Sequence, residues 1–277
     1  MARVLMLGRN QDLFDELRRR ASLDEQDVCF STEVVEELPE LRQQSWDVVV
    51  TNLGTTPSES LALIEQTSRL HPSVRVITLF PAATNQEIID AIRARVFACF
   101  VAPFDPGAIA DMIQTALRAT DWRDGIEVIS GLPHWLTLRV ASHLLTADRV
   151  IGFVSEMQKG MPDDERDLLL AAFRELLLNA MEHGAGFDAE KIIEVTAAKT
   201  ARAIVFHFRD PGLGFDADDL RHAAASESPD EVLASAFERA NRGLRPGGFG
   251  MLIARQIADE LVYNERRNEV LMIKHLE

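Results

Sequence analysis

The stretch FRELLLNAMEHG, residues 173–184, decides how the C-terminal half of this 277-residue chain is interpreted. Glu175 and Asn179 stand four residues apart in it, a spacing that places both side chains on one face of an α-helix. They flank an apolar stripe made of Leu169, Phe173, Leu176, Leu177 and Ala180. A polar pair of this kind is, by itself, more typical of a solvated helix edge than of a binding site. Its interpretation therefore depends on two later stretches.

The second stretch, RDPGLGF (residues 209–215), follows a run that alternates like a β-strand. An aspartate that leaves a strand into a glycine-rich turn can accept a hydrogen bond from an exocyclic amine. The glycines at positions 212 and 214 allow the backbone to approach a flat ring closely. A plain turn at the end of a strand is the alternative interpretation.

The third stretch, RPGGFGMLIARQIADEL (residues 245–261), is a glycine-rich turn that opens into a helical pattern. Backbone N–H groups at such a helix start, together with the helix dipole, suit a chain of phosphates. The stretch is not a P-loop, and it does not fit the dinucleotide fingerprint either. Each of the three stretches is ambiguous alone.

Their order and spacing together resemble the nucleotide-binding boxes of the Bergerat-fold ATPases, the superfamily of histidine kinases and gyrase. The closest resemblance is to the anti-sigma-factor serine/threonine kinases, and it covers about residues 127–276. The matching positions of the first box are Glu175, Leu176, Asn179, Ala180, His183 and Gly184. Those of the other two boxes are Asp210, Gly212, Gly214 and Phe215, then Gly247, Gly248, Gly250, Met251 and Ile253.

The resemblance implies an ATP site with a role for each box. Asp210 is expected to read the adenine amino group, and Gly212 and Gly214 are expected to shape the wall of that pocket. Three further glycines are expected to approach the phosphates at a helix start: Gly247, Gly248 and Gly250.

The resemblance also assigns the metal and the base. Asn179 is expected to contact a Mg²⁺ ion that bridges the phosphates, because this hard cation prefers oxygen ligands. Glu175 is expected to be the general base that orients or deprotonates an attacking hydroxyl group. His183 either joins the hydrogen-bond network of the site or caps the end of the helix ahead of Gly184.

The first half of the chain repeats a strand followed by a helix five times, which predicts a doubly wound, flavodoxin-like parallel sheet. The expected strands are residues 3–8, 27–31, 46–54, 73–80 and 97–101. This order resembles the receiver domain of response regulators over about residues 2–120.

The positions that carry receiver chemistry depart from the receiver pattern. They read Gly8 and Arg9, then Asn52, then Phe80 or Pro81, then Ala102 before Pro103. Without carboxylates there is no Mg²⁺ cage, and an asparagine cannot form an acyl phosphate. We therefore predict a pseudo-receiver that cannot take phosphate and serves protein contact or domain docking. A shifted alignment could place Asp47 at the phospho-accepting position. Its side chain would then leave from the wrong end of the third strand.

Domain boundaries follow from these patterns: a pseudo-receiver over residues 1–121, a linker over 122–127 and a Bergerat α/β sandwich over 128–277. In the second domain, helices are expected on one face of an antiparallel sheet, and the helix with the first box is expected to start at residues 162–164. The long polar segment 216–246 is interpreted as a lid over the nucleotide, with a solvated loop as the alternative.

Composition limits the partners. Twenty-nine basic and 44 acidic residues give a formal charge of −15, which repels nucleic acid and anionic membranes. No apolar run is long enough for a signal peptide or a membrane span, so we expect a cytoplasmic protein. Cys29 and Cys99 lie in apolar surroundings and are interpreted as core thiols.

Three functions remain open from the sequence. The leading hypothesis is an ATP-dependent serine/threonine kinase that phosphorylates a small antagonist protein and holds a sigma factor. The second is an orphan histidine kinase, although none of the seven histidines has an acidic residue directly after it. The third is a non-catalytic, ATP-responsive binding module. The resemblance also implies homodimerisation.

Overall fold

The computed structural model describes residues 3–32, 45–52, 57–119, 124–214 and 254–276. The chain forms two compact units, Met1–Asp124 and Gly125–Glu277. The first strand of the second unit begins at Ile126, inside the stretch predicted as a linker. The segment expected to be a lid, residues 216–246, and the third glycine-rich box lie outside the described residues.

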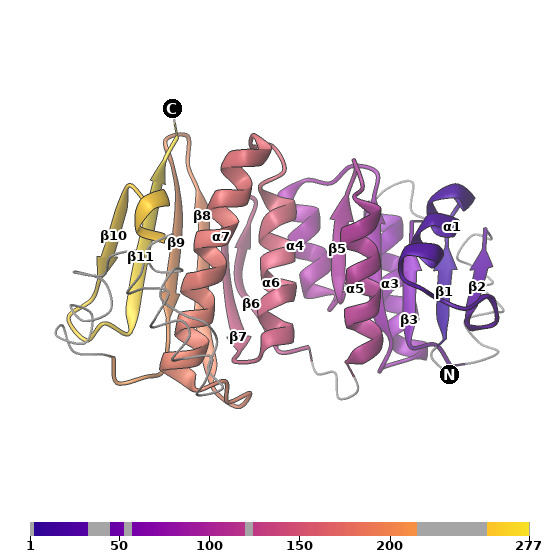
Figure 1. Ribbon diagram of the computed structural model, residues 1–277, viewed down its shortest axis with the longest axis horizontal. Helices are drawn as coiled ribbons and strands as arrows, with labels where there is room; N and C mark the ends of the chain where they lie inside the picture. The colour runs from indigo at the N-terminus through magenta and orange to yellow at the C-terminus, as the bar shows by residue number, and fades with distance from the viewer. Residues whose placement is uncertain (1–2, 33–44, 53–56, 120–123, 215–253, 277) are drawn as a thin grey trace, which may run out of the picture. The chain divides into compact units, whose positions relative to one another are not determined.

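The N-terminal unit contains a five-stranded parallel sheet in the order β2-β1-β3-β4-β5 (Figure 1). Its strands are β1 (Val4–Leu7), β2 (Val28–Ser31), β3 (Val48–Thr51), β4 (Arg75–Phe80) and β5 (Ala98–Val101). Strands β1, β3 and β4 are buried along their whole length, as expected for parallel strands covered on both faces. This strand order confirms the predicted flavodoxin-like fold.

The helices of this unit pack in pairs, α1 against α5 and α3 against α4. They are α1 (Gln11–Arg20), α3 (Pro57–Leu70), α4 (Asn85–Arg93) and α5 (Pro106–Arg118), with a short 3₁₀ turn η1 (Glu25–Asp27). Capping residues fix their starts: Asn10 accepts a hydrogen bond from Leu13 N at 3.1 Å, and Thr84 forms a reciprocal capping box with Glu87.

The receiver positions meet at the carboxyl ends of the strands, where Gly8 follows β1 and Asn52 follows β3. A Cβ atom added at Gly8 would lie 3.3 Å from Asn52 Oδ1, so these two positions are neighbours. Asp47 directly precedes β3 and therefore lies at the amino ends of the strands. Its carboxylate accepts a hydrogen bond from Arg3 N at 2.7 Å. The alignment that recruits Asp47 is therefore excluded by its place in the sheet.

The two cysteines differ in burial. Cys99 is 2% exposed in β5, which confirms the prediction of a core thiol. Cys29 is only half-buried, which corrects that prediction for this residue. The reason is its place on β2, which is an edge strand of the sheet.

The C-terminal unit contains a six-stranded antiparallel sheet in the order β10-β11-β9-β8-β7-β6. Its strands are β6 (Ile126–Leu132), β7 (Trp135–Ala141), β8 (Ile192–Lys199), β9 (Ala203–Arg209), β10 (Glu260–Tyr263) and β11 (Glu269–His275). Burial alternates along the central strands, so one face of the sheet carries the core. The predicted hairpins β8–β9 and β10–β11 are confirmed.

Two helices, α6 (Leu144–Met157) and α7 (Asp163–Asn179), pack against this buried face (Figure 1). Helix α7 starts after Pro162, with three acidic residues in its first turn that favour the positive end of the helix dipole. Phe173 anchors α7 to β9, with ring centroids 4.8 Å from Phe206 and 5.1 Å from Phe208. This arrangement confirms the predicted α/β sandwich.

In the described part of the chain, no helix combines the length and the apolar character that crossing a lipid bilayer requires.

Candidate functional site

The first box lies at the C-terminal end of α7. Glu175 and Asn179 are both half-buried there, and Leu176 and Leu177, which lie between them in sequence, are buried in the core. The helix does not stop at Asn179 but widens into a π-helical turn, η3 (Ala180–Ala185). Single π-turns inside or after α-helices are frequent at functional sites. The turn ends at Gly186, whose φ of 67° lies in the left-handed region that glycine adopts without strain.

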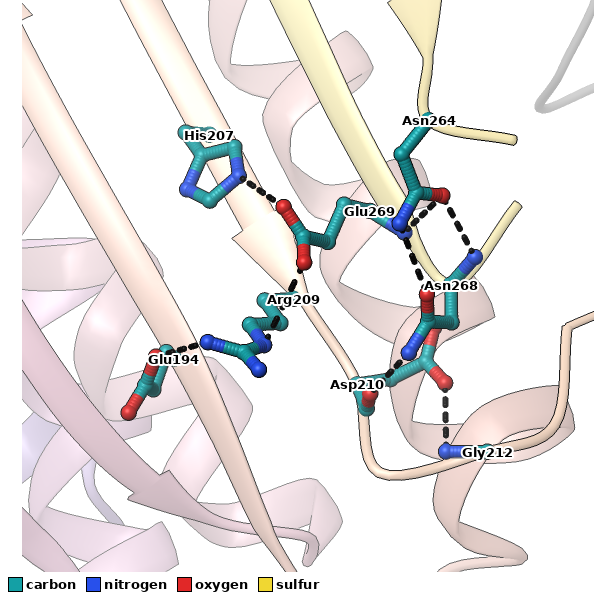
Figure 2. Close-up of polar contacts among 8 residues, drawn as sticks. All are labelled: Glu194, His207, Arg209, Asp210, Gly212, Asn264, Asn268 and Glu269. Atoms are coloured by element: carbon teal, nitrogen blue, oxygen red, sulfur yellow. Dashed lines mark hydrogen bonds and ion pairs between the residues drawn. The ribbon is translucent and has the colours of Figure 1, made fainter. Parts of the chain in front are cut away.

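The second box begins where β9 ends. Asp210 Oδ1 accepts a hydrogen bond from Gly212 N at 2.8 Å, which closes a tight turn on the aspartate side chain (Figure 2). The backbone of Asp210 is held by β11, because its N–H donates to the carbonyl oxygen of Asn268 at 3.0 Å. The carboxylate therefore leaves the end of the sheet in a defined direction.

The first two boxes are in direct contact. A Cβ atom added at Gly184 would overlap the side chain of Asp210. A Cβ atom added at Gly212 would lie 2.9 Å from Gly184 Cα and 3.0 Å from its carbonyl oxygen. The overlap at Gly184 and the 2.9 Å distance at Gly212 are shorter than real Cβ contacts, so a side chain at either position requires its neighbours to move. The structure thus joins the π-turn after α7 to the turn after β9.

Burial is the largest influence on the pKa of Asp210. Removal of the carboxyl group from water raises its pKa above the ordinary value of 3.8. The hydrogen bond from Gly212 and the nearby charge of His183 act in the opposite direction, because both stabilise the ionised carboxylate. His183 therefore belongs to the electrostatic surroundings of Asp210, which favours the network role over a helix cap alone.

Two asparagines in the β10–β11 turn, which were not predicted as candidate site residues, connect to Asp210 through hydrogen bonds. Asn268 Nδ2 donates to the carbonyl oxygen of Asp210 at 3.2 Å, and Asn264 Nδ2 donates to Asn268 Oδ1 at 2.9 Å (Figure 2). The available signal was a pair of asparagines that flank a polar turn between two strand patterns, because asparagine side chains commonly close such turns.

An ion-pair cluster lies on the face of the sheet opposite to the face that α6 and α7 cover. Arg209 bonds to Glu269 at 3.3 Å and to Glu194 at 3.7 Å, and His207 Nε2 lies 3.4 Å from Glu269. Phe208, between them in sequence, is buried in the core, so His207 and Arg209 point to the opposite face. This cluster (Figure 2) is therefore separate from the carboxylate of Asp210.

The structure brings together only part of the predicted site. Gly184, Asp210 and Gly212 are in contact, and Glu175 and Asn179 lie on the helix that precedes Gly184. Gly214 follows in the same loop, with a φ of 82°. Gly247, Gly248 and Gly250 lie outside the described residues, so their approach to phosphates stays a prediction.

Comparison with known proteins finds a similarity in the C-terminal part. Residues 140–274 match the family model of the histidine kinase-like ATPase domain. This range contains α7, η3, β9 and most of the β10–β11 hairpin, so it includes both boxes that meet in the structure. Among proteins of curated function, none matches the chain.

Several of the similar chains among solved structures are response regulators. A response regulator from Thermotoga maritima shares 18% identity with a TM-score of 0.37, covering 42% of this chain and 98% of that one. A CheY-like receiver domain protein from Methanospirillum hungatei shares 17% identity with a TM-score of 0.37, covering 42% of this chain and 94% of that one.

Proposed function

We propose that this chain binds ATP with Mg²⁺ in its C-terminal unit and transfers the terminal phosphoryl group to a serine or threonine of a small antagonist protein. The observation that carries the proposal is the contact of Gly184 with Asp210 and Gly212, since it brings two separate predicted nucleotide boxes together. The match of residues 140–274 to the histidine kinase-like ATPase domain supports it.

We assign Asp210 as the residue that recognises the adenine ring. One oxygen of Asp210 is occupied by the N–H of Gly212, and we assign the other, Oδ2, as acceptor for the exocyclic amino group. The absence of side chains at Gly184 and Gly212 lets the two turns pack against each other and against Asp210, which holds this carboxylate at the end of β9. Partial burial of Asp210 strengthens such a hydrogen bond, because competing water is reduced.

The end of α7 fits a magnesium ion held mainly by phosphates. In the part of the chain that the structure describes, no three His, Cys, Asp or Glu side chains group as metal ligands. Mg²⁺ in nucleotide sites is usually bound by one or two protein oxygens, phosphates and water, so a single carboxamide oxygen suits it. We assign that ligand to Asn179, and the ion supplies charge neutralisation at the phosphates.

Glu175 stands one helical turn before Asn179 and is half-buried. We assign it as the general base that accepts the proton of the attacking hydroxyl group. Because phosphoryl transfer depends mostly on positioning and charge neutralisation, the packing of Phe173 against β9 contributes by holding the helix that carries Glu175.

The N-terminal unit then serves protein contact. It has a receiver-like sheet, but glycine and asparagine stand where carboxylates would hold a metal and accept phosphate. The partners we propose are an antagonist protein with an acceptor serine or threonine, a sigma factor and a second copy of the chain in a cytoplasmic homodimer. The formal charge of −15 argues against nucleic acid and anionic membranes as partners.

The test is incubation with labelled ATP, Mg²⁺ and candidate small antagonist proteins from the same cell, with wild type compared with Glu175→Ala and Asn179→Ala. Label on a serine or threonine of the partner, lost in both variants, supports the kinase. Tight ATP binding without transfer supports the alternative, a non-catalytic ATP-responsive module. Label on a histidine of the chain itself overturns both in favour of a histidine kinase.

A further inference from the structure

The β10–β11 turn, residues 264–268, contacts both ends of the loop that follows β9. At one end, Asn268 and Asp210 exchange two hydrogen bonds, Asn268 Nδ2 to Asp210 O at 3.2 Å and Asp210 N to Asn268 O at 3.0 Å. At the other end, Gly214 lies against Arg266, and a Cβ atom added at Gly214 would collide with the carbonyl oxygen of Arg266. The turn therefore contacts the segment 210–214 at both of its ends.

The turn is itself held by one side chain. Asn264 Oδ1 accepts hydrogen bonds from the backbone N–H groups of Asn268 at 3.1 Å and Glu269 at 3.2 Å. Its Nδ2 donates to Asn268 Oδ1 at 2.9 Å, which leaves the Nδ2 of Asn268 directed at Asp210 (Figure 2). In this way Asn264 fixes the orientation of the Asn268 carboxamide, and Asn268 fixes the backbone of Asp210.

We propose that Asn264 and Asn268 are positioning residues for base recognition, acting through Asp210. Their polar groups are engaged with the turn and with the backbone of Asp210. With that backbone held on both its N–H and its carbonyl, the carboxylate of Asp210 can move only about its own side-chain bonds. The inference rests on the proposed function, because it assumes that this carboxylate reads the adenine amino group.

The test compares the affinities of the full chain for ATP and for inosine triphosphate, both with Mg²⁺, by isothermal titration calorimetry. Inosine carries a carbonyl where adenine carries the amino group, so it has no hydrogen bond to give to Asp210. The wild type should prefer ATP. Asn268→Ala should reduce this preference by about tenfold or more, as expected when a hydrogen bond to a charged group loses its geometry.

The chain offers a matched control at the other end of β9. Thr200 Oγ1 accepts hydrogen bonds from Arg202 N at 3.2 Å and Ala203 N at 2.9 Å in the β8–β9 turn. Thr200→Ala thus removes a comparable turn-closing acceptor, and it should lower the unfolding midpoint while it keeps the ATP preference. Asn268→Asp, which keeps the shape but lacks the donor, replaces Asn268→Ala if the latter does not fold.

The outcomes separate the inference from the proposed function. A preference that persists in Asn268→Ala and Asn268→Asp but is lost in Asp210→Asn overturns the positioning role alone. An equal loss of preference in Thr200→Ala also overturns it, because general destabilisation then explains the effect. A preference that persists in Asp210→Asn overturns both, since Asp210 then does not read the base. Loss of the preference for ATP over inosine triphosphate in Asn264→Ala as well as in Asn268→Ala supports the role of both asparagines.

Discussion

Gly184 of the π-turn lies so close to Asp210 that no side chain larger than hydrogen fits between them. This contact connects α7, which carries Glu175 and Asn179, to the end of β9, where Asp210 lies. The contact between the π-turn and Asp210 therefore depends on the absence of a Cβ atom at Gly184.

Gly184→Ala should disturb this contact. The added methyl group overlaps the Asp210 carboxylate, so we expect ATP affinity to fall at least about tenfold and stability to fall by about 1–3 kcal/mol, as for other overpacked sites. Calorimetric titration and urea unfolding measure the two effects. The matched control is Gly152→Ala in α6, where an added Cβ meets nothing within 4 Å. It should keep ATP binding and raise stability by about 0.5–1 kcal/mol. Unchanged ATP affinity in Gly184→Ala contradicts the prediction.

Asp210→Asn should separate binding from stability. Because burial raises the pKa of Asp210 above 3.8, the folded state holds the proton more tightly than the unfolded chain does. Stability is therefore lost as the pH rises from 3.8 through the folded pKa, and the cost is present at neutral pH. The asparagine variant lacks this ionisation but can still accept from Gly212 N.

We accordingly expect the nucleotide-free variant to have a higher thermal midpoint than wild type at neutral pH, with the two midpoints converging at acidic pH. The same variant should lose its preference for ATP. A variant that is less stable than wild type at neutral pH and equally stable at acidic pH reverses the expected sign.

Glu175→Gln should remove catalysis and spare binding. The glutamine keeps the shape of the side chain but cannot accept a proton, so phosphoryl transfer should fall about 10²–10⁴-fold. The Kd for ATP with Mg²⁺ should change less than about threefold. Single-turnover transfer assays and calorimetry measure the two quantities, and a variant that retains transfer excludes Glu175 as the base.

Asn179→Ala should act on the metal instead. Loss of the carboxamide oxygen should weaken ATP binding in the presence of Mg²⁺ and leave binding with EDTA unchanged. Calorimetric titrations with and without the metal test this. Equal weakening in both conditions indicates a structural role for Asn179 rather than metal contact.

Arg209→Gln should have little effect, although Arg209 directly precedes Asp210. Its side chain is 57% exposed, and its partners Glu194 and Glu269 are 47% and 33% exposed. Exposed ion pairs contribute about 0.2–1 kcal/mol each and are screened by salt. Urea unfolding at low and high salt should show a loss below about 2 kcal/mol that shrinks as salt increases. A larger, salt-independent loss shows that the cluster on this face is a structural core.

Asn52→Asp should not restore phosphorylation of the N-terminal unit. Gly8 and Arg9 still stand where a receiver has the carboxylates that hold Mg²⁺, so one new aspartate lacks its metal. Incubation with acetyl phosphate and Mg²⁺, followed by intact-mass measurement, should show no added phosphate in wild type or variant. A mass increase in Asn52→Asp means that the remaining residues suffice for the chemistry.

The sequence by itself indicated the five parallel strands of the first half and the hairpins and the long helix of the second half. The continuous apolar runs of β1 and β3 indicate strands buried on both faces, and the alternation of β8 and β9 indicates one covered face, because these patterns report local burial. The same local information placed Glu175 and Asn179 on one helix and Asp210 after a strand.

Only the tertiary structure decided which of these groups touch. The contact of Gly184 with Asp210 depends on how α7 packs on β9. The two hydrogen bonds between Asn268 and Asp210 depend on β11 lying next to β9 in the sheet. Neither relationship has a periodic signal, because both join residues far apart in sequence through strand order and register. The half-exposed Cys29 has the same cause, since an apolar strand does not reveal whether it lies at the centre or the edge of its sheet.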